Sequence, residues 1–535
     1  MSTSLCDLPA LEQLRLIKSR EISATELLEA HLARIDAVEG RRPSTDAYTP
    51  DPEDLKYVHA FITVTRERAQ AQARAVDEAL ANGQDPGPLA GLPLAVKDIF
   101  CVRGTPSTAG SRILERFVSP YTATPVARME AVGAVMIGKV NMDEFAFGSS
   151  SESSAFLPPP GNPWNPAYVP GGSSGGSTAA VAAGEAALSL GTDTAGSIRQ
   201  PAAFCGVVGL KPTYGRVSRY GLIAFASSLD CPGLMGREVR DVALALQVIA
   251  GPDPYDATAA QVPVPDYLTS LERPIEGMRI GLSPDYFKLK YPDPETGEIR
   301  ERGIAPEIEA AVWRAAEVLA GMGAEIVEDV PMPHTRYGIP AYFVVSRVEA
   351  ASNLHRYDGV KYGHRFEGPV ADLGELYRRS RGEGFGPQPK LRILMGMYVS
   401  AEQYEKGYYE TALRARTLIR RDFDQAFDPQ GDYRLDCLLT ATTPTTAFKI
   451  GDVYGDTVMM QYADSLTVSA NHAGIPALSI PAGFDSSGLP IGIQILSPDF
   501  TEERLFQVGR AYEIATQDEP WRRATPTVVK SVEGG

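Results

Sequence analysis

Segments with the apolar pattern of buried strands alternate with helix-like segments along this chain, and this alternation restricts its possible folds most. Residues 89–100 are predicted to form a turn and a buried strand, residues 126–145 a helix, a strand and a loop, and residues 490–516 a strand followed by a helix. Parallel strands need such crossover helices, which then cover the faces of the sheet. We therefore expect an α/β fold with a large, mostly parallel central sheet covered by helices.

Helix signals are clearest near the N-terminus and in the second half of the chain. Ser23 and Glu26 form a capping-box pattern ahead of apolar residues at helical spacing, and Thr501 is the expected cap of another helix. Residues 340–425 are predicted to be mostly helical. Residues 526–535 are expected to form a flexible tail, as chain ends often do.

The composition is that of an ordinary folded protein with an excess of acid. The chain is 44% hydrophobic and 22% charged, and its net charge of −16 does not favour a nucleic-acid-binding surface of its own. Neither a signal peptide nor a run of about 18 apolar residues is evident. Five scattered cysteines without CxxC spacing indicate a reducing compartment, so we expect a cytoplasmic protein. They are Cys6, Cys101, Cys205, Cys231 and Cys437.

A phosphate-binding loop is the first chemistry to test, because residues 133–140 (GAVMIGKV) nearly match its pattern. The pattern requires Ser or Thr after the lysine, and Val140 stands there. The apolar residues between the glycines favour a buried strand, which is our interpretation. No HExxH pattern or Cys/His spacing that suggests a metal site occurs in the sequence either.

A serine in a segment of small residues, 191–206 (GTDTAGSIRQPAAFCG), is a candidate nucleophile. The backbone N–H groups before Ser197 could stabilise an anion. A serine needs a base, however, and none of the six histidines lies near Ser197 in sequence. The GxSxG pattern of another hydrolase class is also absent.

A lysine could be the base if burial keeps it neutral. Lys97 interrupts an apolar strand, although it could also extend to solvent or pair with Asp98. Ser173 and Ser174 lie between glycine pairs in residues 169–184. That segment resembles a linker but continues directly into an apolar helix, which a linker would not do.

Lys97, residues 170–176 (PGGSSGG) and residues 191–218 together resemble the amidase signature family, and the match extends over essentially the whole chain. The resemblance implies an α/β/α sandwich around a mixed, mostly parallel sheet and a Ser–cis-Ser–Lys triad. In that triad Ser197 is the nucleophile, Ser173 the bridging serine and Lys97 the base. The resemblance also implies an oxyanion hole formed by four backbone N–H groups. These belong to Thr194, Ala195, Gly196 and Ser197.

Several phrases are similar to one branch of the family, the glutaminase subunits of tRNA-dependent amidotransferases. They include NPWNPAYVPGGSSGGS, EAASNLHRYDGVKYGHR and TPTTAFKIG. The resemblance implies hydrolysis of glutamine through an acyl-enzyme. The ammonia converts Glu-tRNA(Gln) to Gln-tRNA(Gln), and often Asp-tRNA(Asn) to Asn-tRNA(Asn). It places Arg392 on the glutamine carboxylate, Asp464 on the ammonium group and Tyr342 in the same pocket.

The same resemblance implies partners. Two further subunits, B and C, would complete a heterotrimer, and the B subunit would carry ATP, Mg²⁺ and most contacts with tRNA, so that no cofactor or metal is expected in this chain. A free-standing amidase for small or aryl amides, and a non-enzymatic scaffold, are the alternatives. The sequence departs from the family at Ala195, where the branch often has glycine, and in the Pro-rich segments 41–57 and 286–300.

The resemblance also sets the expected domain organisation. We expect a single domain over residues 1–525, with the signature core at about 90–250 and the helical glutamine-pocket region at about 340–425. Residues 526–535 would follow as the tail.

Overall fold

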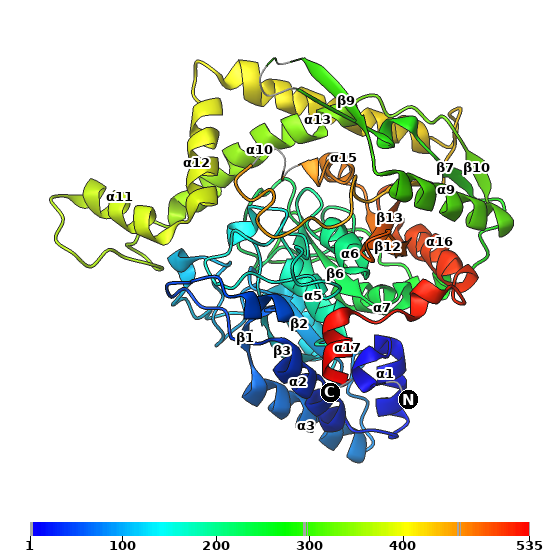
Figure 1. The fold of residues 1–535 in the computed structure, drawn as a ribbon, viewed down its shortest axis with the longest axis horizontal. Coiled ribbons are helices and arrows are strands. Elements are labelled where there is room, and N and C mark those ends of the chain that lie inside the picture. Colours follow the sequence, from blue (N-terminus) through cyan, green and yellow to red (C-terminus); the bar gives the residue numbers. More distant parts are fainter. Residues whose placement is uncertain (1–3, 293–295, 297, 457–459, 461, 534–535) are drawn as a thin grey trace.

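The computed structural model describes residues 4–292, 296, 298–456, 460 and 462–533. Within them, one eleven-stranded sheet runs through the molecule (Figure 1). In spatial order its strands are β1 (Phe61–Val64), β3 (Val135–Val140), β2 (Pro93–Lys97), β4 (Leu188–Asp193), β6 (Cys231–Gly236), β5 (Val208–Lys211), β12 (Ala477–Phe484), β13 (Pro490–Leu496), β11 (Cys437–Ala441), β7 (Arg279–Gly281) and β10 (Glu325–Val327).

Parallel pairing is concentrated in two blocks of this mixed sheet. Strands β3, β2 and β4 pair in parallel, as do β11, β7 and β10. Between the blocks, the strands from β4 through β6, β5, β12 and β13 to β11 pair in an antiparallel manner. The α/β class expected from the alternation of elements is confirmed. The 133–140 segment contains strand β3, as we interpreted it.

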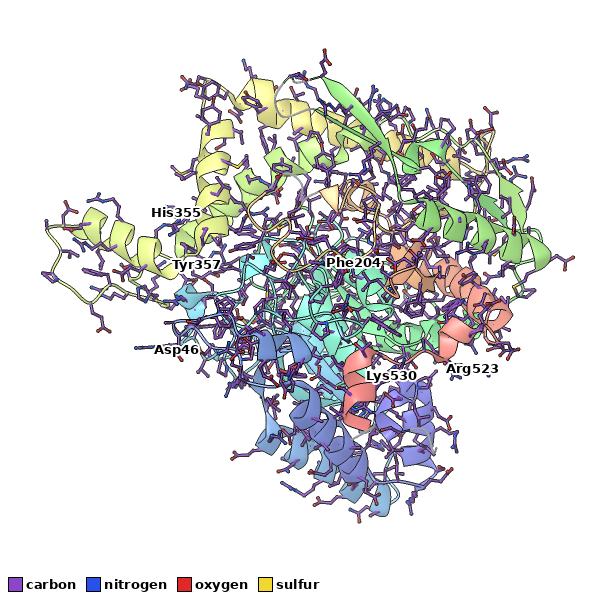
Figure 2. The ribbon with its side chains drawn as sticks, in the orientation of Figure 1. Asp46, Phe204, His355, Tyr357, Arg523 and Lys530 are labelled. Carbon is purple, nitrogen blue, oxygen red and sulfur yellow. The ribbon has the colours of Figure 1, made fainter. Side chains whose placement is uncertain are left out.

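Helices cover the sheet and extend beyond it. They are α1 (Ala10–Lys18), α2 (Ala24–Val38), α3 (Arg66–Ala81), α4 (Thr124–Ala131), α5 (Gly175–Ala182), α6 (Arg199–Cys205), α7 (Val239–Ile249), α8 (Tyr267–Ser270), α9 (Pro306–Gly321), α10 (Gly338–Asn353), α11 (Leu373–Gly384), α12 (Pro387–Val399), α13 (Glu405–Phe427), α15 (Val468–Ala473), α16 (Glu502–Ala515) and α17 (Thr527–Glu533). Helices α5 and α6 pack together on the sheet, and α7 and α9 both contact α16. Helix α11 projects from the body as an arm, with Tyr357 near its base (Figures 1 and 2).

Of the two predicted helix caps, the structure contains the one at α2 and lacks the one at α16. The Glu26 N–H donates to Ser23 Oγ (3.0 Å), and the Ser23 N–H donates to Glu26 Oε2 (2.7 Å), which confirms the capping box. Thr501 does precede α16, but its hydroxyl donates to the Pro498 carbonyl (2.7 Å) and caps no helical N–H group.

The expected flexible tail is wrong for the described part of residues 526–535. Residues Thr527–Glu533 form helix α17, which packs on α2 with Val528 and Val529 buried. The Val528 N–H donates to the Pro163 carbonyl (3.3 Å), and Thr527 Oγ1 donates to the Trp164 carbonyl (2.6 Å). Burial of the two valines and these hydrogen bonds offset the conformational entropy that is lost when a chain end becomes ordered. The polar residues around the valines made this packing hard to predict from the sequence.

The two Pro-rich segments fold in different ways. Residues Pro52–Lys56 form a short 3-10 helix, and Asp54 in it pairs with Arg41. Part of segment 286–300 forms a hairpin of β8 (Lys288–Pro292) and β9 (Ile299–Gly303), while 293–295 and 297 lie outside the described residues. All five cysteines are buried and unpaired. The described helices include none with the length and apolarity that a membrane crossing requires.

Two carboxylic acids, Glu39 and Glu185, are buried together away from the candidate site. Glu39 accepts the N–H groups of Ala60 (2.6 Å) and Phe61 (3.1 Å). Both oxygens of Glu185 lack a hydrogen-bond partner among the described residues. Burial raises the pKa of Glu39 to about 7, and burial and the Glu39 charge raise the pKa of Glu185 well above its ordinary value.

The pair therefore predicts a loss of stability at alkaline pH. The folded protein holds these protons more tightly than the unfolded chain, so stability falls as pH rises from about 4.5 through 7 and beyond. Glu185→Gln should raise the Tm at pH 8.5 by several degrees and change it little at pH 5.5. The exposed Glu67→Gln serves as the control in the same thermal melts. Equal Tm changes at both pH values would contradict this reasoning.

Candidate active site

Lys97 ends strand β2 in the middle of a parallel block and has no exposed surface. Its Nζ donates to three hydroxyl oxygens: Ser173 Oγ (2.7 Å), Ser174 Oγ (2.8 Å) and Thr192 Oγ1 (2.9 Å). If Lys97 were charged, its only hydrogen-bond acceptors among the described residues would be these neutral hydroxyl groups. Thr192 was not predicted from the sequence, because only the folded sheet brings β4 beside β2. No role was predicted for Ser174 either.

A second buried lysine provides a contrast. Lys139 on β3 forms an ion pair with Asp98 (2.8 Å), so the suggested Lys97–Asp98 pairing is wrong. No carboxylate among the described residues lies within 4 Å of Lys97. Burial therefore lowers the pKa of Lys97 to about 7, although three more distant carboxylates act in the opposite direction. A substantial neutral fraction at pH 7 is what a general base needs.

Ser173 and Ser197 lie on neighbouring segments. The Gly172–Ser173 peptide is cis, in keeping with the cis-serine that the resemblance implied. The Ser174 N–H donates to the Ser197 carbonyl (3.2 Å). Ser197 is 4% exposed, and its hydroxyl forms no hydrogen bond with the described residues. The structure therefore contains the Lys97–Ser173 link, while the Ser173–Ser197 link is not formed as a hydrogen bond.

The loop before Ser197 presents unused N–H groups. None of the N–H groups of residues 194–197 donates to an acceptor within the described parts of the chain. Gly196 must be glycine, because a Cβ there would lie 2.2 Å from Thr467 Oγ1 and 2.6 Å from Asp464 Oδ1. Ala195, by contrast, fits: it is buried, and its carbonyl accepts a hydrogen bond from Thr467 Oγ1 (2.7 Å).

A buried ion pair holds this loop, and sequence reasoning missed it. Asp193 Oδ2 accepts from Arg199 Nε (3.0 Å) and from the Ile198 N–H (3.2 Å), and Asn471 Nδ2 donates to Asp193 Oδ1 (2.8 Å). Asp193 and Arg199 have opposite charges and lie on either side of Ser197 in the sequence, and this pattern could have predicted their ion pair. Asn471 is distant in sequence and could not be found in this way.

Arg392 and Asp464, which the resemblance placed at opposite ends of a ligand, are both buried with unused polar atoms. Arg392 is 1% exposed, and all three of its guanidinium nitrogens lack partners among the described residues. Asp464 Oδ2 accepts from Ser149 Oγ (2.5 Å), whereas Oδ1 has no partner. Burial raises the pKa of Asp464 to about 8. Such groups are costly unless a ligand completes them.

Aromatic rings surround the same guanidinium. The Arg392 guanidinium lies 5.1 Å from the centre of the Phe147 ring, which packs edge-on against Phe225. Phe225 in turn packs edge-on against Tyr342, the third predicted pocket residue. Gly196 joins this region to the serine, since it lies against Asp464. The structure therefore brings the predicted site residues together, and all of them are buried.

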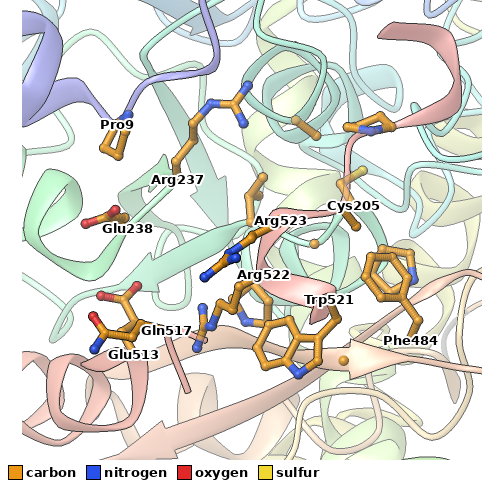
Figure 3. A pocket seen from close by; sticks show the side chains of 18 of the residues that line it. Pro9, Cys205, Arg237, Glu238, Phe484, Glu513, Gln517, Trp521, Arg522 and Arg523 are labelled. Carbon is orange, nitrogen blue, oxygen red and sulfur yellow. The ribbon is translucent and has the colours of Figure 1, made fainter. Parts of the chain in front are cut away.

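A cavity of about 520 Å³ lies elsewhere, between the N-terminal segment and the chain after α16 (Figure 3). Arg237, Trp521 and Arg522 are among its lining residues. None of the candidate site residues lines it. We therefore assign the chemistry to the buried cluster around Lys97.

The fold and the buried site are those of an enzyme of the amidase class. A model of the Amidase family matches residues 53–506, so the chain belongs to the amidase signature family. The A subunit of glutamyl-tRNA(Gln) amidotransferase from Synechococcus sp. (strain WH7803) is 51% identical over 92% of this chain and 94% of its own. Its counterpart of the same name from Moorella thermoacetica is 49% identical over 95% and 97%.

Solved structures agree with this assignment. The crystal structure of the glutamyl-tRNA(Gln) amidotransferase A subunit from Thermotoga maritima has a TM-score of 0.74 and 34% identity, covering 97% of this chain and 96% of its own. Peptide amidase from Stenotrophomonas maltophilia has a TM-score of 0.76 and 28% identity, covering 98% and 99%. The fold is thus shared by amidotransferase subunits and free-standing amidases, and the sequence identity is higher to the former.

Proposed function

We propose that this chain is the glutamine-hydrolysing subunit of a tRNA-dependent amidotransferase, which converts Glu-tRNA(Gln) to Gln-tRNA(Gln). One observation carries the proposal: Lys97 is buried, forms no ion pair with a described carboxylate and donates a hydrogen bond to Ser173, on the segment next to Ser197. The relatives that carry the name of that subunit support the proposal as well. Two of them are 51% and 49% identical to this chain over more than nine-tenths of its length. The free-standing amidase has no comparable support.

The proposed reaction begins with proton transfer along the triad. Neutral Lys97 accepts a proton from Ser173, and Ser173 accepts one from Ser197 as Ser197 Oγ attacks the side-chain amide carbon of glutamine. The hydroxyl of Ser197 must turn toward Ser173 for this step, and such bonds often tighten only when substrate binds. Backbone N–H groups of the 194–197 loop stabilise the oxyanion, each typically by about 3–4 kcal/mol.

Collapse of the tetrahedral intermediate breaks the C–N bond. The proton held by the triad returns to the nitrogen, ammonia leaves, and a glutamyl ester remains on Ser197. Water then attacks the ester with the same base, which releases glutamate and restores the serine. Asp464 would accept the substrate ammonium group and Arg392 would donate to the carboxylate, which uses the atoms that lack partners.

The assembly around this chain is also part of the proposal. The chain works in a multi-subunit amidotransferase, with B and C subunits in a heterotrimer in the cytoplasm. The B subunit holds ATP, Mg²⁺ and most of the tRNA, where the ammonia is used. The net charge of −16 supports this division, because an acidic protein is poorly suited to bind tRNA alone.

The direct test is glutamine conversion by the tagged chain, purified from its own host with its partners. Hydrolysis should increase when ATP and Glu-tRNA(Gln) are added. A solitary chain that ignores glutamine and cleaves simple amides would overturn the proposal in favour of a free-standing amidase.

The pH dependence of glutamine hydrolysis should separate two groups. Because the pKa of Lys97 is about 7 in the free enzyme, kcat/KM should rise through pH 7 as the base becomes neutral, and kcat should rise with pH for the same reason. Asp464, whose pKa burial raises to about 8, must ionise to hold the ammonium group. The additional rise near pH 8 should therefore appear in kcat/KM and be absent from kcat, since only kcat/KM reports the free enzyme. A kcat that is flat from pH 5.5 to 8.5 would contradict the lysine base.

A further inference from the structure

Arg347, in α10, is a buried guanidinium that the triad and the predicted pocket leave unexplained. It is 1% exposed, and its Nη1 donates to Ser346 Oγ (3.0 Å). Its Nε and Nη2 have no hydrogen-bond partner, and no carboxylate lies within ion-pair distance, among the described residues. Arginine stays charged in proteins, so this burial is costly until an anion compensates it.

The surroundings of Arg347 identify where that anion belongs. The centre of its guanidinium lies 3.8 Å from the Phe343 ring centre and 5.6 Å from that of Tyr342. Burial and the nearby Arg392 cation lower the pKa of Arg347, and only Tyr342 acts in the opposite direction. Arg347 therefore lies near a like charge and a pocket residue, and no described carboxylate forms an ion pair with it.

Close packing of α10 on α12 brings the two arginines together. Gly396 lies one turn after Arg392 on α12, and a Cβ there would lie only 2.0 Å from the Arg347 carbonyl oxygen. Burial raises the pKa of Tyr342, whereas both guanidinium groups lower it, so both lie near this pocket residue. Among the described residues, five of their guanidinium nitrogens lack partners: two from Arg347 and three from Arg392. Like charges this close in a buried region repel strongly unless an anion lies between them.

We propose that Arg347 is a second carboxylate-binding residue of the glutamine pocket, which donates together with Arg392 to the α-carboxylate of the substrate. This inference rests on the proposed function of the same site. A carboxylate can accept about four hydrogen bonds, which two guanidinium groups can supply and one cannot. The site would therefore select substrates with a free α-carboxylate. It would reject those in which that group is an amide or ester.

The test compares four single variants in the full complex: Arg347→Met, Arg347→Gln, Arg347→Lys and the control Arg356→Gln. Arg356 is exposed just beyond α10, so its change removes the same charge outside the pocket. Arg347→Met and Arg347→Gln should raise the KM for glutamine by about 10- to 100-fold with kcat changed by less than about threefold. Arg347→Lys should recover part of the loss, and Arg356→Gln should match the wild type.

Thermal stability without ligand distinguishes binding from structural support. Removing an uncompensated buried charge should leave the Tm of Arg347→Met at least as high as that of the wild type. An unchanged KM in a folded variant would overturn the inference. So would a raised KM accompanied by a lower Tm and no recovery in Arg347→Lys. A wild-type complex that does not hydrolyse glutamine would instead refute the proposed function.

Discussion

Ser197→Ala should reduce glutamine-dependent formation of Gln-tRNA(Gln) by about 10⁴-fold or more, while formation from added ammonium stays within about twofold of the wild type. The substitution removes only a hydroxyl that forms no hydrogen bond with the described residues, so the buried loop and the rest of the complex should fold normally. In the proposed complex, added ammonium would bypass this chain, because we assign the acceptor reaction to the B subunit. The measurement is product formation with each nitrogen donor.

Two results would contradict this prediction. Loss of both activities in an intact complex would mean that Ser197 serves assembly or tRNA binding. Retention of glutamine use would mean that another nucleophile acts. Ser174→Ala is a matched control, because Ser174 accepts a hydrogen bond from Lys97, as Ser173 does. The Ser174 hydroxyl itself donates to the Thr192 carbonyl (3.1 Å). Ser174→Ala should lower the rate much less than Ser197→Ala does.

Lys97→Met should lower kcat for glutamine hydrolysis by at least about 10³-fold without unfolding the protein. Methionine is apolar and similar in length, and Lys97 has no acidic partner among the described residues whose charge would be left exposed. The remaining cost is that three neutral hydroxyl oxygens lose a hydrogen-bond donor, which is less costly than leaving a charge unpaired. The measurements are steady-state kinetics and a thermal melt on the same preparation.

Lys139→Met is the matched control, with the opposite expected result. It breaks the buried pair with Asp98, leaves that carboxylate unpaired and should cost about 3–5 kcal/mol of stability. The folded fraction should retain its kcat, since the side chain of Lys139 donates only to Asp98, Phe100, Pro106 and Ser107 among the described residues, and none of these is a predicted site residue. If both lysine variants lose stability and keep activity, Lys97 is a structural residue and the proposed mechanism fails.

The residues that form the site could be predicted from the sequence, but the hydrogen bonds and ion pairs that they form could not. The small-residue segments around Ser173 and Ser197 are distinctive because backbone must approach closely there, as Gly196 illustrates. The choice between Asp98 and a hydroxyl cluster as the partner of Lys97 depends on which strands are neighbours. The register of β2, β3 and β4 decides it, and this is a property of the sheet as a whole.

Two other features show the same limit. Alternation of strands and helices predicted a mostly parallel sheet and not its antiparallel centre, which depends on long connections whose direction no local pattern records. Helix α17 lacked a strong sequence signal because its stability comes from two valines packed on α2. Arg347 lay in a predicted helix, and only its complete burial without an acid reveals it.

Covalent labelling of the nucleophile tests the central claim most directly. The intact complex would be treated with an electrophilic glutamine analogue, digested, and analysed by mass spectrometry to locate the modified residue. The account predicts modification of Ser197, slowed by excess glutamine, slowed at pH values below 7 and absent in Ser197→Ala. Modification of a different residue, or no protection by glutamine, would contradict it.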